Sequence, residues 1–161
     1  MAVELPKDLG HYGERLQRLI NQNKKYENLA EGWGVNFNGD FLFIIEPDKL
    51  YPEETRYLLL ELEDGKCLDT RQLANNNSLD FGVKLSGPHK IWRGFLESVE
   101  TDMRYITQDG LKIEIDDSLH RLQSETTGGN NSDLTLFDRY IKAHYLMARI
   151  AKRVEVEYPN P

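Results

Sequence analysis

The apolar positions of the first thirty residues recur with the period of an amphipathic helix. Between Asp8 and Trp33 they fall at steps of three, four and seven residues, while charged residues occupy the opposite face. Asp8, which follows Pro6, is a suitable N-cap. The pattern predicts one helix over about residues 8–33 that covers a core.

The pattern then changes to that of strands joined by tight turns. Residues 35–45 carry Asn38-Gly39 between apolar segments, and this dipeptide is typical of a two-residue hairpin turn. Residues 56–70 repeat the arrangement around Asp64-Gly65. Two successive hairpins are therefore predicted, separated by a proline-containing loop.

The middle of the chain alternates strand and helix signals. Strict alternation predicts a half-buried strand over residues 79–85, and Ser86-Gly87-Pro88 then predicts a helix start. Helical spacing continues over residues 91–99, and a second short helix is predicted over residues 101–108. Alternation returns over residues 111–115 and predicts the last strand.

The C-terminal part consists of a polar linker and a helix. The linker, about residues 124–131, is rich in glycine and asparagine, and the helix, about residues 132–153, has a broad apolar face. Residues 34–122 form a core of antiparallel strands and helices between the terminal helices. Because strands and helices are segregated, we predict one α+β domain over residues 1–161.

Composition and charge exclude some classes of function for this sequence. Apolar residues make up 39% and charged residues 29% of the chain, as expected of a folded, water-soluble domain. A net charge of −7 argues against binding to nucleic acid, and the longest apolar runs are too short for stable membrane insertion. The absence of a secretory signal and the single Cys67 predict a cytoplasmic protein.

The residues that usually carry chemistry are scattered. The four histidines, His11, His89, His120 and His144, lie in separate segments, without the close pairs of metal sites. Cys67 lies inside a predicted strand without a local basic partner for its thiol, and no phosphate-binding loop is present. We therefore expect no catalytic residues, no metal and no cofactor. His144 lies within an apolar helical face, where it is either a hydrogen-bonded core residue or a pocket residue.

Four segments of the second half together resemble the corresponding part of a sterol-carrier-protein domain. They carry, in order, a strand, a helix, a short helix, and a glycine followed by a strand, at residues 79–85, 91–96, 102–106 and 110–115. The resemblance implies a five-stranded, largely antiparallel sheet covered by helices. It also implies an apolar tunnel that binds or transfers a lipid, a fatty acyl chain, a sterol or a similar compound, without catalysis or cofactor.

The binding interpretation selects a set of apolar side chains as candidate ligand contacts. They are the wall residues Trp92, Phe95, Leu96, Met103 and Ile106 and the capping residues Phe137 and Tyr140. Periodicity alone does not distinguish a cavity wall from a packed core.

Two alternative functions stay open at this point. One is a small, cone-shaped α+β isomerase or cyclase that uses a buried acid or histidine, with His144 as candidate base. The other is a non-catalytic interaction module, either a homodimer or a subunit of a larger enzyme complex. Exposed aromatic faces would favour the interaction module.

Overall fold

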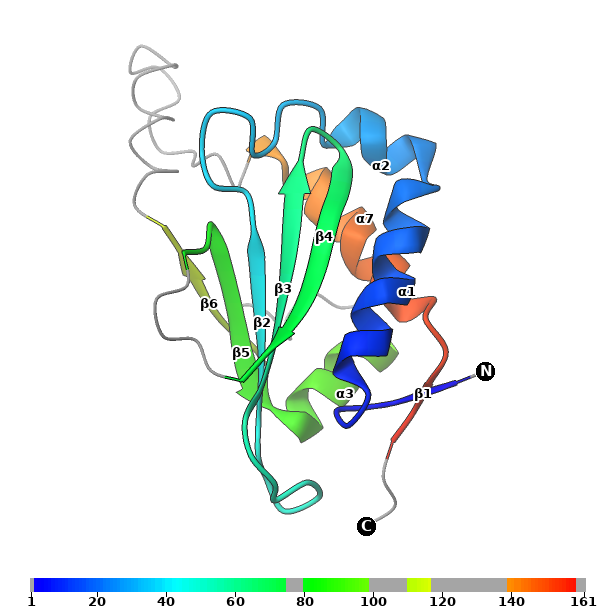
Figure 1. The fold of residues 1–161 in the computed structure, drawn as a ribbon, viewed down its shortest axis with the longest axis vertical. Helices are drawn as coiled ribbons and strands as arrows, with labels where there is room; N and C mark the ends of the chain where they lie inside the picture. Colours follow the sequence, from blue (N-terminus) through cyan, green and yellow to red (C-terminus); the bar gives the residue numbers. More distant parts are fainter. Residues whose placement is uncertain (1, 75–79, 99–109, 117–138, 159–161) are drawn as a thin grey trace.

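A single five-stranded sheet with helices on one face forms the frame of the protein (Figure 1). The structure is a computed structural model that describes residues 2–74, 80–98, 110–116 and 139–158. The strands are β2 (Phe41–Glu46), β3 (Arg56–Glu63), β4 (Lys66–Leu73), β5 (Val83–Pro88) and β6 (Lys112–Ile115). Their order across the sheet is β4-β3-β2-β5-β6.

The sheet is mixed, with its one parallel pair at the centre. β2 pairs with β5 in parallel, whereas β3 with β2, β4 with β3 and β6 with β5 are antiparallel. The predicted α+β domain with a largely antiparallel five-stranded sheet is therefore confirmed. The parallel pair requires a long connection between β2 and β5, which the β3–β4 hairpin supplies.

The central strand β2 is buried on both faces. Phe41, Phe43 and Ile45 belong to the main core, on the side of the helices. Leu42 and Ile44 point the other way and form a smaller apolar cluster with Leu59. Burial on both faces explains why this strand is an uninterrupted apolar run rather than an alternating one.

The four helices formed by the described residues lie on the same side of the sheet (Figure 1). They are α1 (Leu9–Asn21), α2 (Lys24–Leu29), α3 (His89–Ser98) and α7 (Ile141–Lys152). α1 packs on β3 and β4, α3 packs on β2 and β5, and α7 contacts α1, α2 and α3. α1 approaches the sheet closely at Gly13, where an added Cβ would lie 2.8 Å from Leu58 Cδ1.

The two ends of the described chain lie side by side. β1 (Val3–Glu4) pairs in parallel with β7 (Val156–Glu157). The hydroxyl of Tyr12 in α1 donates to the carbonyl oxygen of Ala151 at the end of α7, over 3.0 Å. The sequence analysis did not predict this small sheet, because a two-residue strand carries no periodic pattern.

The predicted single helix over residues 8–33 is wrong in two respects, because the chain breaks after Asn21 and the second helix ends at Leu29. Asn23 adopts an extended conformation, and its side-chain oxygen accepts from the backbone N–H of Tyr26 over 2.9 Å, which begins α2. Both helices bury their apolar residues in the same core, so the apolar period continues across the break.

The hairpin predicted around Asn38-Gly39 is also wrong. Residues 35–37 form no strand, and β2 pairs with β3 and β5 instead. The indole of Trp33 donates to the carbonyl oxygen of Gly39 over 2.9 Å, so tertiary packing holds this segment. The second hairpin is confirmed, since Asp64 (φ 51°) and Gly65 (φ 82°) form a tight turn between β3 and β4.

The strand predicted over residues 79–85 lies further along the chain than expected. β5 begins at Val83 and continues through Pro88, because Gly87 and Pro88 pair with Ile45 and Glu46 of β2. The helix accordingly begins at His89. The last strand and the C-terminal helix are confirmed as β6 and, over its described part, α7. The short helix predicted over 101–108 and the linker over 124–131 lie outside the described residues.

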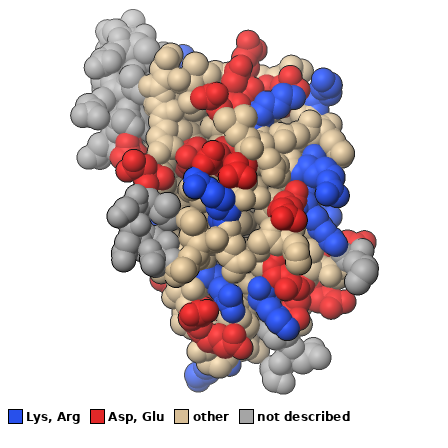
Figure 2. All heavy atoms as spheres, in the orientation of Figure 1, with Lys and Arg blue, Asp and Glu red and all other residues tan. Residues whose placement is uncertain are grey.

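Charged side chains of both signs are interspersed on the face of the molecule in Figure 2, without a broad basic patch. Ion pairs join neighbouring strands: Arg71 of β4 pairs with Glu61 of β3, and Lys84 of β5 with Glu114 of β6 over 3.0 Å. This face therefore lacks the positive stripe that nucleic-acid-binding proteins present. In the part of the chain that the structure describes, no helix has the length and apolar character needed to cross a membrane.

Candidate functional site

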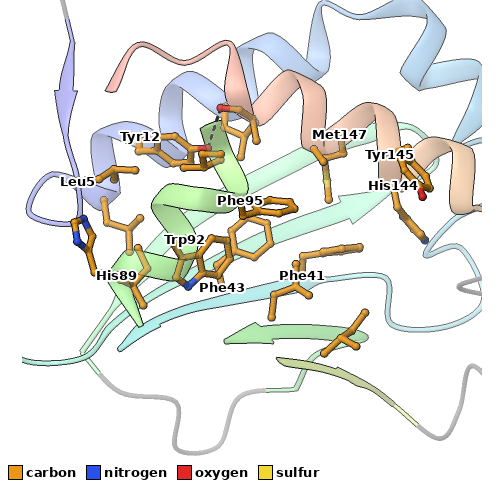
Figure 3. A pocket seen from close by; sticks show the side chains of 18 of the residues that line it. Leu5, Tyr12, Phe41, Phe43, His89, Trp92, Phe95, His144, Tyr145 and Met147 are labelled. Atoms are coloured by element: carbon orange, nitrogen blue, oxygen red, sulfur yellow. Dashed lines mark hydrogen bonds between the residues drawn. The ribbon is translucent and has the colours of Figure 1, made fainter. Parts of the chain in front are cut away.

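An apolar cavity of about 250 Å³ lies between the sheet and the helices. Its floor is formed by β2, β5 and β6, and its walls and roof by α1, α3 and α7 (Figure 3). Side chains from both ends of the described chain, Leu5 and Tyr158, complete the lining. None of the described lining residues is an acid, a lysine or an arginine.

The helix α3 supplies one wall through Trp92, Phe95 and Leu96, all of them buried. The indole of Trp92 donates to the carbonyl oxygen of Ile44 in β2 over 2.7 Å, which satisfies its polar atom. Its ring lies 5.4 Å from the ring of Phe43 and 6.1 Å from that of Phe95. This wall is therefore attached to the floor by a hydrogen bond and by aromatic contacts.

The roof is formed where α1 crosses α7. Leu9, Tyr12 and Leu16 of α1 face the cavity together with Met147 and Ala148 of α7. Burial raises the pKa of Tyr12, and its hydroxyl is already bonded to the Ala151 carbonyl oxygen. The phenol is therefore neutral, and only its ring contributes to the cavity surface.

Asp48 positions the start of α3 from the loop after β2. Its carboxylate accepts from the backbone N–H groups of Leu50 and Tyr51 over 3.0 Å each, and from that of Lys90 over 2.6 Å. Burial alone would raise the pKa of Asp48, but these hydrogen bonds outweigh it and lower the pKa. The carboxylate thus orders the loop and caps the helix that carries the cavity wall.

We expect Asp48→Ala to lower the free energy of unfolding by about 1–2 kcal/mol, because it removes the cap of α3. The native pKa lies below the unfolded value, so this stabilisation is present at neutral pH. It should be lost as the pH falls through the lowered native pKa, below the ordinary 3.8. Urea unfolding of both proteins at several pH values measures the difference.

The exposed Glu46, close by at the end of β2, provides the control for this measurement. Glu46→Ala should change the free energy of unfolding by no more than about 0.5 kcal/mol. A loss for Asp48→Ala that stayed constant down to strongly acidic pH would contradict the role assigned to its carboxylate.

Two buried histidines line the cavity at opposite ends (Figure 3). His144 of α7 lies 4.6 Å from the ring of Trp33, edge to face, and 5.3 Å from that of Phe41. Of the two interpretations given from sequence, it is both a core residue and a residue that borders the cavity. His89, the first residue of α3, lies at the other end and is 1% exposed.

The seven candidate contact residues fall into three groups in the structure. Trp92, Phe95 and Leu96 line the cavity, whereas Met103, Ile106 and Phe137 lie outside the described residues. Tyr140 lies elsewhere: its ring is 5.4 Å from that of Trp33, and its hydroxyl donates to the Glu31 carbonyl oxygen over 2.9 Å. Tyr140 is not among the described residues that line the cavity, and its hydroxyl attaches the start of α7 to the segment after α2.

Sequence reasoning missed several lining residues, including His89, Tyr158 and the β2 side chains Phe41 and Phe43. The two-residue period of a strand could have placed Phe41 and Phe43 on one face together, because every second residue of a strand faces the same side. No sequence signal distinguishes His89 from an exposed histidine at a helix start.

The titratable side chains of the described cavity lining are two histidines and three tyrosines, namely His89, His144, Tyr12, Tyr145 and Tyr158. No group of three or more potential metal ligands occurs among the described residues. Cys67 is buried in β4, away from the cavity lining, and burial raises its pKa to about 12. The thiol is thus a packing residue, as the sequence indicated, and what the arrangement offers is an apolar space.

Comparison with known proteins shows where this fold occurs. No family model and no curated protein matches the sequence. The crystal structure of sterol carrier protein 2 is similar with a TM-score of 0.64 and 15% identity, over 89% of this chain and 95% of that one. A solution structure from Thermus thermophilus, of a conserved hypothetical protein that is possibly a sterol carrier protein, also gives 0.64 and 15%, over 91% and 88%. The resemblance in fold is confirmed.

Proposed function

We propose that this chain, whose fold is similar to that of sterol carrier protein 2, binds or transfers an apolar small molecule in the cavity between its sheet and helices. The observation that supports the proposal is the lining itself, which is almost wholly aliphatic and aromatic. A cavity with such walls is poorly hydrated, because water finds few hydrogen-bonding partners in it. An apolar molecule is the natural occupant.

The favourable free energy comes from removing the ligand surface from water. Burial of roughly 200 Å² of apolar surface contributes about 5 kcal/mol before the entropic costs of binding are subtracted. Preorganised walls reduce those costs, and the wall of α3 is held in place by the bond from Trp92 to β2. We assign Trp92, Phe95 and Leu96 as ligand contacts on this wall.

Binding of this kind requires no catalytic step. The alternative of a cone-shaped isomerase needed a buried acid or histidine as base. Among the described residues no acid lines the cavity, and both of its histidines lie against aromatic rings, His144 against Trp33 and Phe41 and His89 against Tyr51 and Tyr158. We therefore propose a carrier and not an enzyme. A reduced, buried Cys67 is compatible with a role in the cytoplasm.

The interaction module receives no support from the exposed apolar residues of the described part. The large hydrophobic side chains exposed there are Val35, Leu68 and Tyr145. They come from the turn after α2, from β4 and from α7, and do not share one element. Single exposed hydrophobic residues are normal on soluble proteins.

Native mass spectrometry of the purified protein tests the proposed function. Under gentle conditions we expect a fraction of the protein to carry an apolar compound that is released on denaturation, and the same spectrum reports whether the protein is a monomer or a homodimer. In parallel, the neutral fluorescent probe N-phenyl-1-naphthylamine should bind and be displaced by medium-chain apolar compounds. A protein that carries nothing and binds none of these compounds would refute the carrier function.

A further inference from the structure

His89 is the polar group in the apolar cavity that the binding function does not yet use. It lies at the start of α3, 1% exposed, between the rings of Tyr51 and Tyr158, whose centroids are each 5.8 Å away. Figure 3 shows it at one end of the cavity, beside Leu5, with Trp92 next along the wall. A ligand that fills the cavity reaches this side chain.

Neither ring nitrogen of His89 forms a hydrogen bond of good geometry in the part of the chain that the structure describes, although the Leu5 backbone lies near enough to raise its pKa slightly. The hydroxyl of Tyr51 is engaged elsewhere, since it donates to Glu53 over 3.0 Å and accepts from Arg56 over 3.2 Å. The carboxylate of Asp48 accepts from three backbone N–H groups. Buried polar groups in native proteins are nearly always paired, so an unpaired imidazole at the end of a binding cavity indicates a partner that arrives with the ligand.

The burial of His89 favours a neutral ring. Burial lowers the pKa of His89, against the smaller opposing effects of the Asp48 carboxylate and the Leu5 backbone, and Arg93 adds to the lowering. Arg93 is itself paired with Glu97 over 2.8 Å and lies over the ring of Tyr158. A neutral imidazole offers one donor and one acceptor.

We propose that His89 forms a hydrogen bond with a single uncharged polar group of the ligand, so that the cavity selects an apolar molecule with a terminal hydroxyl. This inference rests on the proposed function and specifies its ligand class. A hydroxyl both donates and accepts, so it can pair with either nitrogen of the ring.

A carboxylate is the less favourable partner at this position. The positive end of α3 already faces the Asp48 carboxylate through the N–H of Lys90, and a second anion beside it would be repelled. Among the described residues no lysine or arginine lines the cavity to compensate for its charge.

The test compares 1-decanol, decane and decanoate as competitors of N-phenyl-1-naphthylamine at pH 8. On replacement of His89 by phenylalanine, the affinity for decanol relative to decane should fall about tenfold, the usual effect of one lost neutral hydrogen bond. His89→Gln, which retains a donor and an acceptor, should keep most of the wild-type preference. His11→Phe makes the same replacement at an exposed position of α1 and should leave all three affinities unchanged.

The outcomes separate this inference from the proposed function. If the probe binds and decanol loses nothing relative to decane in His89→Phe, the cavity binds apolar molecules but His89 does not select them. If decanoate binds more tightly than decanol and this preference requires His89, the ligand is an anion and the assigned class is wrong. Failure of the probe and all three compounds would refute the proposed function itself.

A second measurement follows the response of the wild-type side chain directly. In wild-type protein the imidazole ¹⁵N resonances of His89, assigned by their loss in His89→Gln, should shift on addition of decanol and much less on addition of decane. Equal shifts for both compounds would overturn the proposal.

Discussion

Ala148→Trp is expected to abolish most of the ligand binding while the protein stays folded. Ala148 lies on α7 with its side chain in the cavity lining, so an indole at this position occupies the space that a ligand would fill. Displacement of roughly 100 Å² of ligand contact costs about 2.5 kcal/mol, or about 60-fold in affinity. Fluorescence titration with N-phenyl-1-naphthylamine measures the loss.

Arg149→Trp is the matched control for this prediction. Arg149 is the next residue of α7 and is exposed, so the same side chain is added outside the cavity. Its affinity for the probe should equal that of the wild type. If both variants bound the probe as the wild type does, the ligand would lie outside the cavity described above.

Trp33→Ala is expected to be the most destabilising of the substitutions considered, with a loss of about 4–5 kcal/mol in the free energy of unfolding. Trp33 is 1% exposed, and its ring is surrounded by those of Phe37, Tyr140 and His144, with centroids 5.0, 5.4 and 4.6 Å away. The substitution opens a large void and leaves the Gly39 carbonyl oxygen without its donor. Urea unfolding followed by far-ultraviolet circular dichroism measures the loss without relying on tryptophan fluorescence.

Two further variants bracket the effect of this substitution. Trp33→Phe keeps an aromatic ring but removes the indole donor, so we expect a loss of about 2 kcal/mol. Leu68→Ala removes a side chain that is 56% exposed and should cost no more than about 0.5 kcal/mol. A loss below about 2 kcal/mol for Trp33→Ala would show that the aromatic cluster does not stabilise the fold as described.

The elements that the sequence predicts well are those whose local chemistry agrees with their tertiary environment. β3 and β4 are joined by Asp64-Gly65, and both residues take the positive φ angles that this turn requires. α7 and β6 keep their helical and alternating periods because each packs one face against the core. In these segments a local signal is sufficient.

The predictions that failed are those in which a local turn signal was overridden by packing. Asn38-Gly39 resembles a hairpin turn, but Gly39 lies against the indole of Trp33, where an added Cβ would be 2.7 Å from Nε1. Ser86-Gly87-Pro88 resembles a helix start, but these residues extend β5 because the neighbouring strand β2 offers pairing partners. Neither neighbour can be identified from the local sequence.

In the candidate site, helical spacing alone does not decide which residues line the cavity. Trp92, Phe95 and Leu96 have helical spacing, and the structure places them together on one wall. Tyr140 has the same spacing, yet its hydroxyl is bonded to the Glu31 carbonyl oxygen and its ring packs against Trp33. Periodicity assigns a residue to a face of its helix, and the packing of the other elements decides what that face touches.

The pairing of the two ends of the described chain determines when the cavity forms. Leu5 and Tyr158 both line it, and Val3 is paired with Val156. During synthesis Leu5 emerges long before Tyr158, so the lining stays incomplete until the segment that contains Tyr158 has left the ribosome. The cavity therefore closes late in the folding of this domain, after β1 has paired with β7.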